Sequence, residues 1–371
     1  MGFELRSSTG AKSAHRSTTG GPRGAARSAP PRPTAPEPAK KPDLAAVVSL
    51  KVFYATDRKP NDLDPDNPEI QRYGGEWDDQ VHYGECRITL PEDRGLGAFP
   101  RPAWWRFDFQ EDPERHIMAH SVTPMAEDLF FQSLSSVVGG STTKEALVFV
   151  HGFNVSFKSA ALRTAQLAVD LKFDGAPILY SWPARAGPMG AVAYAADANT
   201  IEKTYDHLTA FLQDVARRTG ARRIHVLAHS MGNRAACNAL ERIAVTTPAA
   251  AVPIFGHVVL AAPDLDQQRF KQLVAKFQSH TSKVTLYASS KDKALKLSKR
   301  FNAAPRAGEP MVVLAGMDSV DASNVDTDLL GHGFFSDARS VLSDIFGVIR
   351  DEAVAKRFNL QLHGDHYRFR P

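Results

Sequence analysis

After residue 145 the sequence repeatedly alternates short apolar runs with helical patterns. Helical spacing of apolar residues separates or follows these runs, which are residues 146–150, 177–180, 224–228, 257–261, 284–288 and 311–314. Alternation of this kind is typical of a parallel sheet covered by helices on both faces. The sequence therefore predicts an α/β fold with a mostly parallel central sheet flanked by helices.

The length of one connection limits what can be added to this fold. Residues 264–284 have room for a single helix, whose apolar positions include Phe270, Leu273 and Phe277. Loops in α/β units are short, and an inserted domain needs many more residues. We therefore expect no large cap domain at this point of the chain.

The segment before residue 145 has a different pattern. Short runs of strand character occur at residues 48–54, 85–90, 105–109 and 116–122, and no helical pattern lies between them. Strands joined without helices are typical of antiparallel pairing. The sequence predicts that these runs add antiparallel strands to the parallel sheet.

The basic charge of the chain is concentrated at its N-terminus. Of the 45 Lys and Arg residues, eight lie in residues 1–41, which hold only two of the 41 acidic residues. The remainder is close to neutral, so the pI of about 9.0 gives no support to a basic nucleic-acid-binding face. The composition predicts a disordered Pro-, Ser- and Ala-rich tail at residues 1–44 and a single domain at residues 45–371.

Composition also excludes several other classes of protein. No stretch approaches the roughly 18 apolar residues that a membrane span needs, and the early positive charge is not followed by the apolar core of a secretory signal. The two cysteines, Cys86 and Cys237, exclude a disulfide-stapled miniprotein and a cysteine-rich zinc module. We expect a cytoplasmic protein without a membrane span.

The most informative motif surrounds Ser230. The apolar run at residues 224–228 leads directly into Ala228, Ser230 and Gly232, and a helical pattern begins at Arg234. A serine on a sharp strand-to-helix turn has a strained backbone and an exposed hydroxyl, and the residues two before and two after it must be small. Ser230 is therefore the candidate nucleophile, and an ordinary helix-capping serine is the alternative.

A second motif follows the run at residues 146–150. His151, Gly152, Phe153 and Asn154 form a turn in which the glycine lets the backbone N–H of Phe153 point at a neighbouring site. An oxyanion hole needs two such donors, and the second is the N–H of Met231, directly after the serine. The alternative is a simple loop with a structural histidine.

The candidate general base is His332. It follows the last expected strand and lies between Gly331 and Gly333, which allow the loop to approach the nucleophile. His151 and His229 lie within the two turns and are interpreted as structural hydrogen-bonding residues. His363 and His366 form an H-x-x-H pattern without a further ligand motif, so they indicate a terminal segment and no metal site.

The candidate acid is Asp292. It follows the run at residues 284–288, two strands after the nucleophile, which agrees with the chain order Ser, Asp, His. Asp264, at the end of the intervening strand, is the alternative acid. Asp318 and Asp321 remain further options, and a turn or helix-capping role is open for each aspartate.

A Gly- and Ala-rich stretch is the candidate wall of a substrate site. Residues 183–199 carry Met189 and Tyr194 and are expected to form a loop over the site together with Trp182. The equal alternative is a plain surface loop.

Taken together, these motifs resemble those of α/β hydrolases, and specifically a bacterial group of uncharacterised esterase- and lipase-like serine hydrolases. The matching stretches are residues 53–58, 151–154, 180–183, 228–233, 260–264, 286–292 and 331–332. The resemblance implies the α/β-hydrolase fold and a catalytic triad with a nucleophile elbow, and it implies no particular substrate.

The expected reaction is cleavage of a carboxylic ester, or a related acyl bond, through an acyl-enzyme on Ser230. Such a reaction takes a small-molecule acyl substrate and needs no metal, organic cofactor or nucleic acid. A thioesterase, amidase or lactonase with the same triad remains an alternative, as does a non-catalytic binding module on the same fold. The sequence gives no oligomeric state.

Overall fold

The computed structural model describes residues 47–61, 72–100, 112, 115–187, 191–248, 254–290, 305–308, 311–325 and 339–370. All of them belong to one compact unit, Leu44–Pro371. The tail expected at residues 1–44 and the strand expected at residues 105–109 lie outside the described residues, so both stay predictions.

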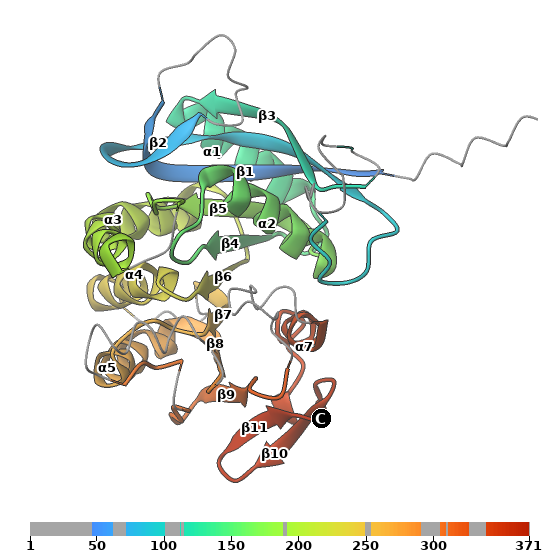
Figure 1. Ribbon diagram of the computed structural model, residues 1–371, viewed down its shortest axis with the longest axis vertical. Coiled ribbons are helices and arrows are strands. Elements are labelled where there is room, and N and C mark those ends of the chain that lie inside the picture. The colour runs from blue at the N-terminus through green and yellow to red at the C-terminus, as the bar shows by residue number, and fades with distance from the viewer. Residues whose placement is uncertain are drawn as a thin grey trace, which may run out of the picture. The chain divides into compact units, whose positions relative to one another are not determined.

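The core of the fold is one sheet, in the order β10-β11-β9-β8-β7-β6-β4-β5-β1-β2-β3 (Figure 1). The strands from β5 through β4, β6, β7 and β8 to β9 are parallel to their neighbours, which confirms the mostly parallel sheet. The strand bounds are β1 Val47–Pro60, β2 Tyr73–Pro91, β3 Met118–Met125, β4 Glu145–Val150, β5 Gly175–Ser181, β6 Arg223–His229, β7 Phe255–Ala261, β8 Thr281–Ala288, β9 Met317–Asp321, β10 Leu360–His363 and β11 His366–Phe369.

The N-terminal strands extend this sheet. β2 is antiparallel to both β1 and β3, as the absence of intervening helical patterns predicts. β1 itself runs parallel to β5, from the pair Phe53 and Ile178 to the pair Thr56 and Ser181, so it joins the two parts of the sheet. This parallel pairing places the end of β1 at the same sheet edge as the end of β5.

Helices cover both faces of the sheet. Figure 1 shows α3, α4 and α5 on one side and α2 and α7 on the other. Each face of the sheet has its own hydrophobic core. In β4, Val148 packs in the core on the side of α3, α4 and α5, and Phe149 packs in the core on the side of α2 and α7, because successive side chains of a strand point to opposite faces. The helix bounds are α1 Glu127–Gly140, α2 Phe157–Asp170, α3 Ala191–Arg218, α4 Gly232–Thr246, α5 Gln267–Phe277 and α7 Arg339–Val348.

The single helix α5 fills the connection between β7 and β8, and this confirms that no cap domain is inserted there. The prediction of a strand at residues 311–314 is wrong, because these residues form no strand in the structure. The sheet is continued instead by β9, and the hydroxyl of Ser319 donates a hydrogen bond to the carbonyl of Val312 at 2.7 Å. Val312 is buried although its segment is irregular, because apolar side chains can be buried by a loop as well as by a strand.

Two elements were not expected from the sequence. Helix α1 buries Phe130, Phe131, Leu134 and Val138. These residues have helical spacing, but they come directly after strand β3. The second is the hairpin of β10 and β11, whose turn contains Gly364 in a left-handed conformation, at φ +64°. His363 and His366 close this hairpin with rings 5.4 Å apart, and the described residues contain no cluster of three metal-binding side chains.

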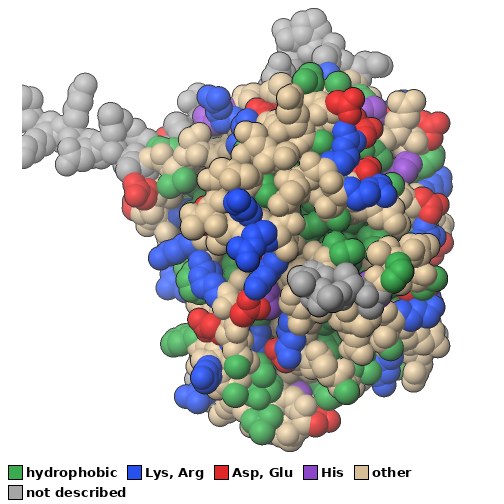
Figure 2. Space-filling model, turned by 180° about the vertical axis from the view of Figure 1, so that it is seen from behind, with side chains coloured by type: hydrophobic (Ala, Val, Ile, Leu, Met, Phe, Trp, Pro, Cys, Tyr) green, Lys and Arg blue, Asp and Glu red, His purple; other side chains and the backbone are tan. Residues whose placement is uncertain are grey.

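The surface of the described residues carries mixed charge. On the face shown in Figure 2, basic and acidic side chains lie among one another and do not form a continuous basic surface. Within the described residues, no helix is both long enough and apolar enough to cross a membrane.

A buried carboxyl group gives the fold a testable pH dependence. Asp344 of α7 accepts a hydrogen bond from the hydroxyl of Tyr287 at 2.5 Å, and burial raises its pKa from 3.8 to about 6 against the opposing charge of Arg357. The native state therefore binds this proton more tightly than the unfolded chain does. The contribution of Asp344 to the free energy of unfolding is present below about pH 4 and is lost as the pH rises to about 6.

We expect Asp344→Asn to remove this component. Urea titrations at about pH 4 and about pH 6.5 measure the free energy of unfolding. The decrease in this free energy from about pH 4 to about pH 6.5 should be smaller in the variant than in the wild type. Equal decreases in both proteins would contradict the assignment.

Candidate active site

Ser230 lies at the turn between β6 and α4 in a strained backbone conformation. Its φ is +49°, a left-handed value that is uncommon for a residue with a side chain. The turn is fixed on both sides, since the N–H of Ser230 donates to the carbonyl of Ala261 at 2.9 Å and its own carbonyl accepts from the Asn233 side-chain amide at 2.9 Å. This is the strand–turn–helix setting that the motif predicts for a nucleophile.

The small residues of the motif have the steric role expected for them. A Cβ atom on Gly232 would lie 2.3 Å from the carbonyl oxygen of His151 and 2.8 Å from that of Val150. Both contacts are to backbone atoms, which cannot move aside as a flexible side chain can. Gly232 therefore allows the start of α4 to pack directly on the end of β4.

This close approach gives a prediction for Gly232→Ala. We expect a loss of about 1–3 kcal/mol in the free energy of unfolding, because the turn that holds Ser230 must shift. Gly139→Ala is the matched control, since nothing lies within 4 Å of its Cβ position in α1. Thermal unfolding measures the effect, and a Gly232→Ala protein as stable as the control would contradict the argument.

The loop after β4 lies against Ser230. A Cβ atom on Gly152 would lie 3.1 Å from the Cβ of Ser230, so the loop after β4 packs directly against the Ser230 turn. Within the part of the chain that the structure describes, the backbone N–H groups of Phe153 and Met231 donate to no acceptor. Two unused N–H donors on either side of a serine can bind an oxyanion.

The two histidines of these turns are held neutral. Burial, and to a lesser extent the charge of Arg58, lowers the pKa of His151 to about 3. Burial and the charge of Arg163 lower the pKa of His229 to about 3 as well. His151 is fully buried and its Nδ1 lies 2.9 Å from the carbonyl oxygen of Gly152. The geometry of His151 is that of a structural hydrogen-bonding residue.

Asp264, the alternative acid, lies close to the turn but its carboxylate is already engaged. It accepts a hydrogen bond from the hydroxyl of Tyr194 at 2.7 Å and forms ion pairs with Arg234 at 3.2 Å and Arg306 at 3.3 Å. Its backbone N–H donates to the carbonyl of Ser230 at 3.2 Å. The residue thus fastens α3, α4 and residue 306 to the end of β7.

The expected substrate wall has a different form. The stretch at residues 183–199 is not a loop throughout, since α3 begins at Ala191. Trp182 is fully buried, stacks on His151 and donates from Nε1 to the His151 carbonyl at 2.7 Å, so it supports the loop after β4 from within the core. Tyr194 is 6% exposed and its ring lies 5.7 Å from that of Phe153.

Three of the predicted site residues, Asp292, His332 and Met189, lie outside the described residues. The structure therefore brings together Ser230, the N–H groups of Phe153 and Met231, and the alternative acid Asp264. The roles of Asp292 and His332 stay predictions from the sequence.

Comparison with known protein families agrees with this geometry. Residues 126–349, well over half of the chain, match the family described as "Alpha/beta hydrolase of unknown function (DUF900)". The chain belongs to this α/β-hydrolase family. Its fold is the α/β-hydrolase fold, with β6 carrying the serine and β4 the adjoining glycine loop.

Other comparisons add little to the family match. A comparison with curated proteins gives no match. Two similar solved structures are the phospholipase PlaB from Legionella pneumophila in complex with thio-NAD, at 14% identity and a TM-score of 0.28, and a PEG-bound cold-adapted esterase from an Arctic intertidal metagenomic library, at 10% identity and a TM-score of 0.31. The first match covers 40% of this hydrolase and only 38% of PlaB, and the second covers 70% and 83%. At these TM-scores the likeness carries no functional argument.

Two buried polar residues to which the sequence motifs assigned no role lie beside the site. Arg58, at the end of β1, is 1% exposed and contacts His151. Asp197 of α3 accepts hydrogen bonds from the N–H groups of Asn154 and Arg185 at 3.3 and 3.0 Å. The sequence feature that could have indicated Arg58 is the run Thr56-Asp57-Arg58, in which three polar residues directly continue an apolar strand.

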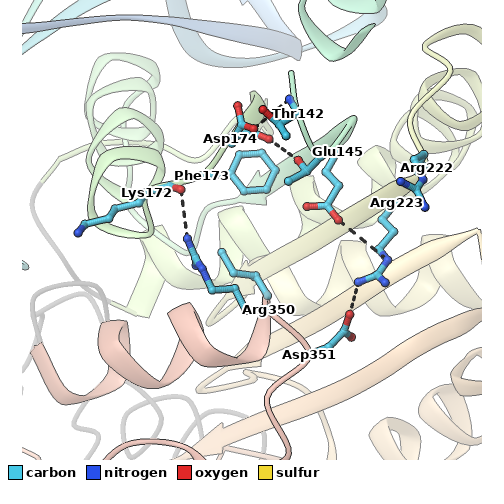
Figure 3. Close-up of a pocket in the computed structure, with 11 residues that line it drawn as sticks. Thr142, Glu145, Lys172, Phe173, Asp174, Arg222, Arg223, Arg350 and Asp351 are labelled. Carbon is cyan, nitrogen blue, oxygen red and sulfur yellow. Dashed lines mark hydrogen bonds and ion pairs between the residues drawn. The ribbon is translucent and has the colours of Figure 1, made fainter. Parts of the chain in front are cut away.

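One hollow of the hydrolase lies far from the serine turn. It has a volume of about 440 Å³ and lies at the amino ends of the parallel strands, between Glu145 at the start of β4 and Arg350 after α7 (Figure 3). Arg223 there forms ion pairs with Asp351 and, at 4.0 Å, with Glu145. Because Ser230 follows the carboxyl end of β6, this hollow is at the opposite edge of the sheet and is not part of the candidate active site.

Proposed function

We propose that this protein is a serine hydrolase that cleaves a carboxylic ester, or a related acyl bond, of a small molecule with Ser230 as nucleophile. The observation that carries the proposal is the position of Ser230 at φ +49° between β6 and α4, with Gly152 packed against its Cβ. This arrangement exposes a hydroxyl beside two backbone donors, which is what acyl transfer to serine requires.

The proposed reaction proceeds through an acyl-enzyme. Ser230 Oγ attacks the acyl carbonyl and its proton passes to His332, while Asp292 orients the imidazole and stabilises its positive charge. The carbonyl oxygen becomes an oxyanion that accepts hydrogen bonds from the N–H groups of Phe153 and Met231. The tetrahedral intermediate collapses when the ester C–O bond breaks and His332 donates its proton to the leaving alkoxide.

Water completes the cycle by the same route. His332 accepts a proton from a water molecule, whose oxygen attacks the acyl carbon, and the proton then returns to Ser230 as the free acid leaves. All proton transfers in this scheme use residues of the chain itself. The burial of Trp182 favours a role in supporting the oxyanion loop over direct substrate contact, and Met189 remains the proposed acyl contact.

The direct test is covalent labelling with a fluorophosphonate probe, which phosphonylates activated serines. We expect the full-length protein to be labelled, with the modified peptide containing Ser230, and Ser230→Ala to remain unlabelled. Ser136→Ala, which changes an exposed serine of α1, should label like the wild type. Absence of labelling in folded wild-type protein would overturn the proposal and favour a non-catalytic binding module.

A panel of chromogenic substrates defines the acyl bond. Oxygen esters of graded acyl chain length, a thioester and an anilide of the same acid should be compared by kcat/KM. The proposal expects the oxygen esters to have the highest values, and preference for the thioester or anilide would move the assignment to a thioesterase or amidase with the same nucleophile.

A further inference from the structure

Arg58 lies near the end of β1 with its guanidinium fully enclosed by protein. A guanidinium carries five N–H donors, and in Arg58 each of the five has an acceptor. Nε donates to Ser181 Oγ at 2.8 Å, Nη1 donates to the carbonyls of Gly74 at 2.7 Å and Ala184 at 2.9 Å, and Nη2 donates to the carbonyl of Val155 at 2.7 Å and to His151 Nε2 at 3.3 Å.

All five acceptors are neutral groups. Burial lowers the pKa of Arg58 to about 9, against the opposing charges of Asp57 and Asp197, so the side chain is still protonated at neutral pH. Among neutral acceptors, the desolvation penalty of the buried cation is not offset by the Coulomb attraction of a carboxylate. Through these hydrogen bonds, the Arg58 side chain connects β2, the loop after β4 and the segment after β5.

The contact with Arg58 favours one of the two neutral tautomers of His151. A guanidinium can only donate, so Nε2 of His151 must accept, and in a neutral imidazole the hydrogen then lies on Nδ1. Ser181 Oγ, which accepts from Arg58 Nε, lies 3.2 Å from the same Nε2, so the hydroxyl and the guanidinium share its single lone pair. The Nδ1–H group of His151 is left to donate to the carbonyl oxygen of Gly152 at 2.9 Å.

The Gly152 carbonyl belongs to the same peptide group as the N–H of Phe153. In a trans peptide these two groups point in opposite directions, so a hydrogen bond that holds the carbonyl toward His151 turns the N–H away from it. A Cβ atom on Gly152 would lie 3.1 Å from the Cβ of Ser230, so this peptide group is next to the Ser230 turn. A hydrogen bond received by the carbonyl also polarises the peptide and strengthens its N–H as a donor.

We propose that Arg58 and His151 are positioning residues of the oxyanion hole. Arg58 fixes His151 as the Nδ1–H tautomer, and His151 fixes the Gly152–Phe153 peptide with its N–H toward the acyl oxygen on Ser230. This inference rests on the proposed function, and it assigns a role to the buried polar end of β1.

The test uses two amide variants that differ in where they place a donor. The side-chain amide of His151→Asn reaches the Nδ1 position and can still donate to the Gly152 carbonyl, whereas that of His151→Gln reaches the Nε2 position and cannot. We expect His151→Gln to lower kcat for a p-nitrophenyl ester by about 10²-fold with little change in KM, as for loss of one oxyanion donor. His151→Asn should retain at least about tenfold more of kcat than His151→Gln.

A trifluoromethyl ketone inhibitor separates this role from a loss of stability. Ser230 Oγ adds to the ketone carbon, the proton moves to His332, and the resulting hemiketal oxyanion needs the same donors as the transition state. The inhibition constant should therefore rise in His151→Gln by about the factor by which kcat falls. Equal kcat and inhibition constants in the two amide variants, or a lower unfolding temperature with unchanged kinetics, would overturn the inference.

Arg58→Lys tests whether Arg58 acts on His151, and it leaves the amino-acid sequence of the loop after β4 unchanged. A lysine has three donors and cannot serve five acceptors, so we expect kcat to fall by about tenfold or more at similar KM. Arg87→Lys, at an exposed position on β2, is the matched control and should keep wild-type kinetics. Wild-type kinetics in Arg58→Lys would contradict the proposal.

The wild-type protein offers a measurement that needs no variant. The imidazole ¹⁵N chemical shifts of His151 at neutral pH should be those of a neutral ring protonated at Nδ1, and a ring protonated at Nε2 or at both nitrogens would overturn the inference. Failure of the proposed function itself would be visible separately, as absence of fluorophosphonate labelling and ester turnover in the wild type.

Discussion

Replacing Ser230 by alanine should lower kcat for p-nitrophenyl esters by about 10⁴–10⁶-fold. The variant lacks the only group that can form the acyl-enzyme in the proposed scheme, while the oxyanion donors and the substrate contacts remain. KM should therefore change little, and a small residual rate should persist from stabilisation of the oxyanion alone. Steady-state kinetics over a range of acyl chain lengths measures both constants.

The backbone at residue 230 makes this variant easy to interpret. Alanine at φ +49° has a strain similar to that of serine, and the turn keeps its bond from the N–H of residue 230 to the carbonyl of Ala261. We expect the unfolding temperature to change little, with Ser136→Ala as the control for both stability and turnover. A folded Ser230→Ala protein that keeps more than about a tenth of the wild-type kcat would remove Ser230 from the mechanism.

The second large effect is expected for Asp292→Asn, which should lower kcat by about 10⁴-fold. An amide in place of the carboxylate can present an N–H donor to His332 and so favour the wrong tautomer of the imidazole, and it has no charge to stabilise the imidazolium. Protein stability should change little by comparison. The measurement is kcat together with the unfolding temperature of the same preparation.

Asp264→Asn is the matched comparison and should have the opposite profile. The Asp264 carboxylate neutralises Arg234 and Arg306 in a buried network, so its removal leaves buried positive charge and should cost about 3–5 kcal/mol of stability. Its kcat at a temperature where the variant is folded should stay within about tenfold of the wild type. If Asp264→Asn loses activity and Asp292→Asn does not, the acid role passes to Asp264.

The parts of the site that are local in the chain could be predicted from the sequence. The positive φ of Ser230 and the close approach at Gly232 follow from a strand that turns into a helix within two residues, and neighbouring residue types are enough to indicate such a turn. The Gly152 loop was predicted for the same reason. The strand order places β4 beside β6 and thereby brings the two turns together.

Other parts of the fold have weaker local signals. The buried run at residues 311–314 and the strand β9 differ by only a few positions, and apolar content does not separate a buried loop from a strand. Helix α1 lies between two strands in the chain, and the pairing of β11 with β9 joins residues about fifty positions apart. Such elements are decided by packing partners rather than by their own propensities.

The α/β architecture, the turn at Ser230 and the glycine loop beside it can be read from the amino-acid sequence, because each is encoded by residues that are adjacent in the chain. The contacts of Arg58 with His151, of Trp182 with the loop after β4 and of Asp264 with two arginines appear only in the folded protein. These contacts join residues from distant strands and helices. Their partners are set by the order of strands in the sheet and by the need of every buried polar group for a partner, neither of which can be read from one segment alone.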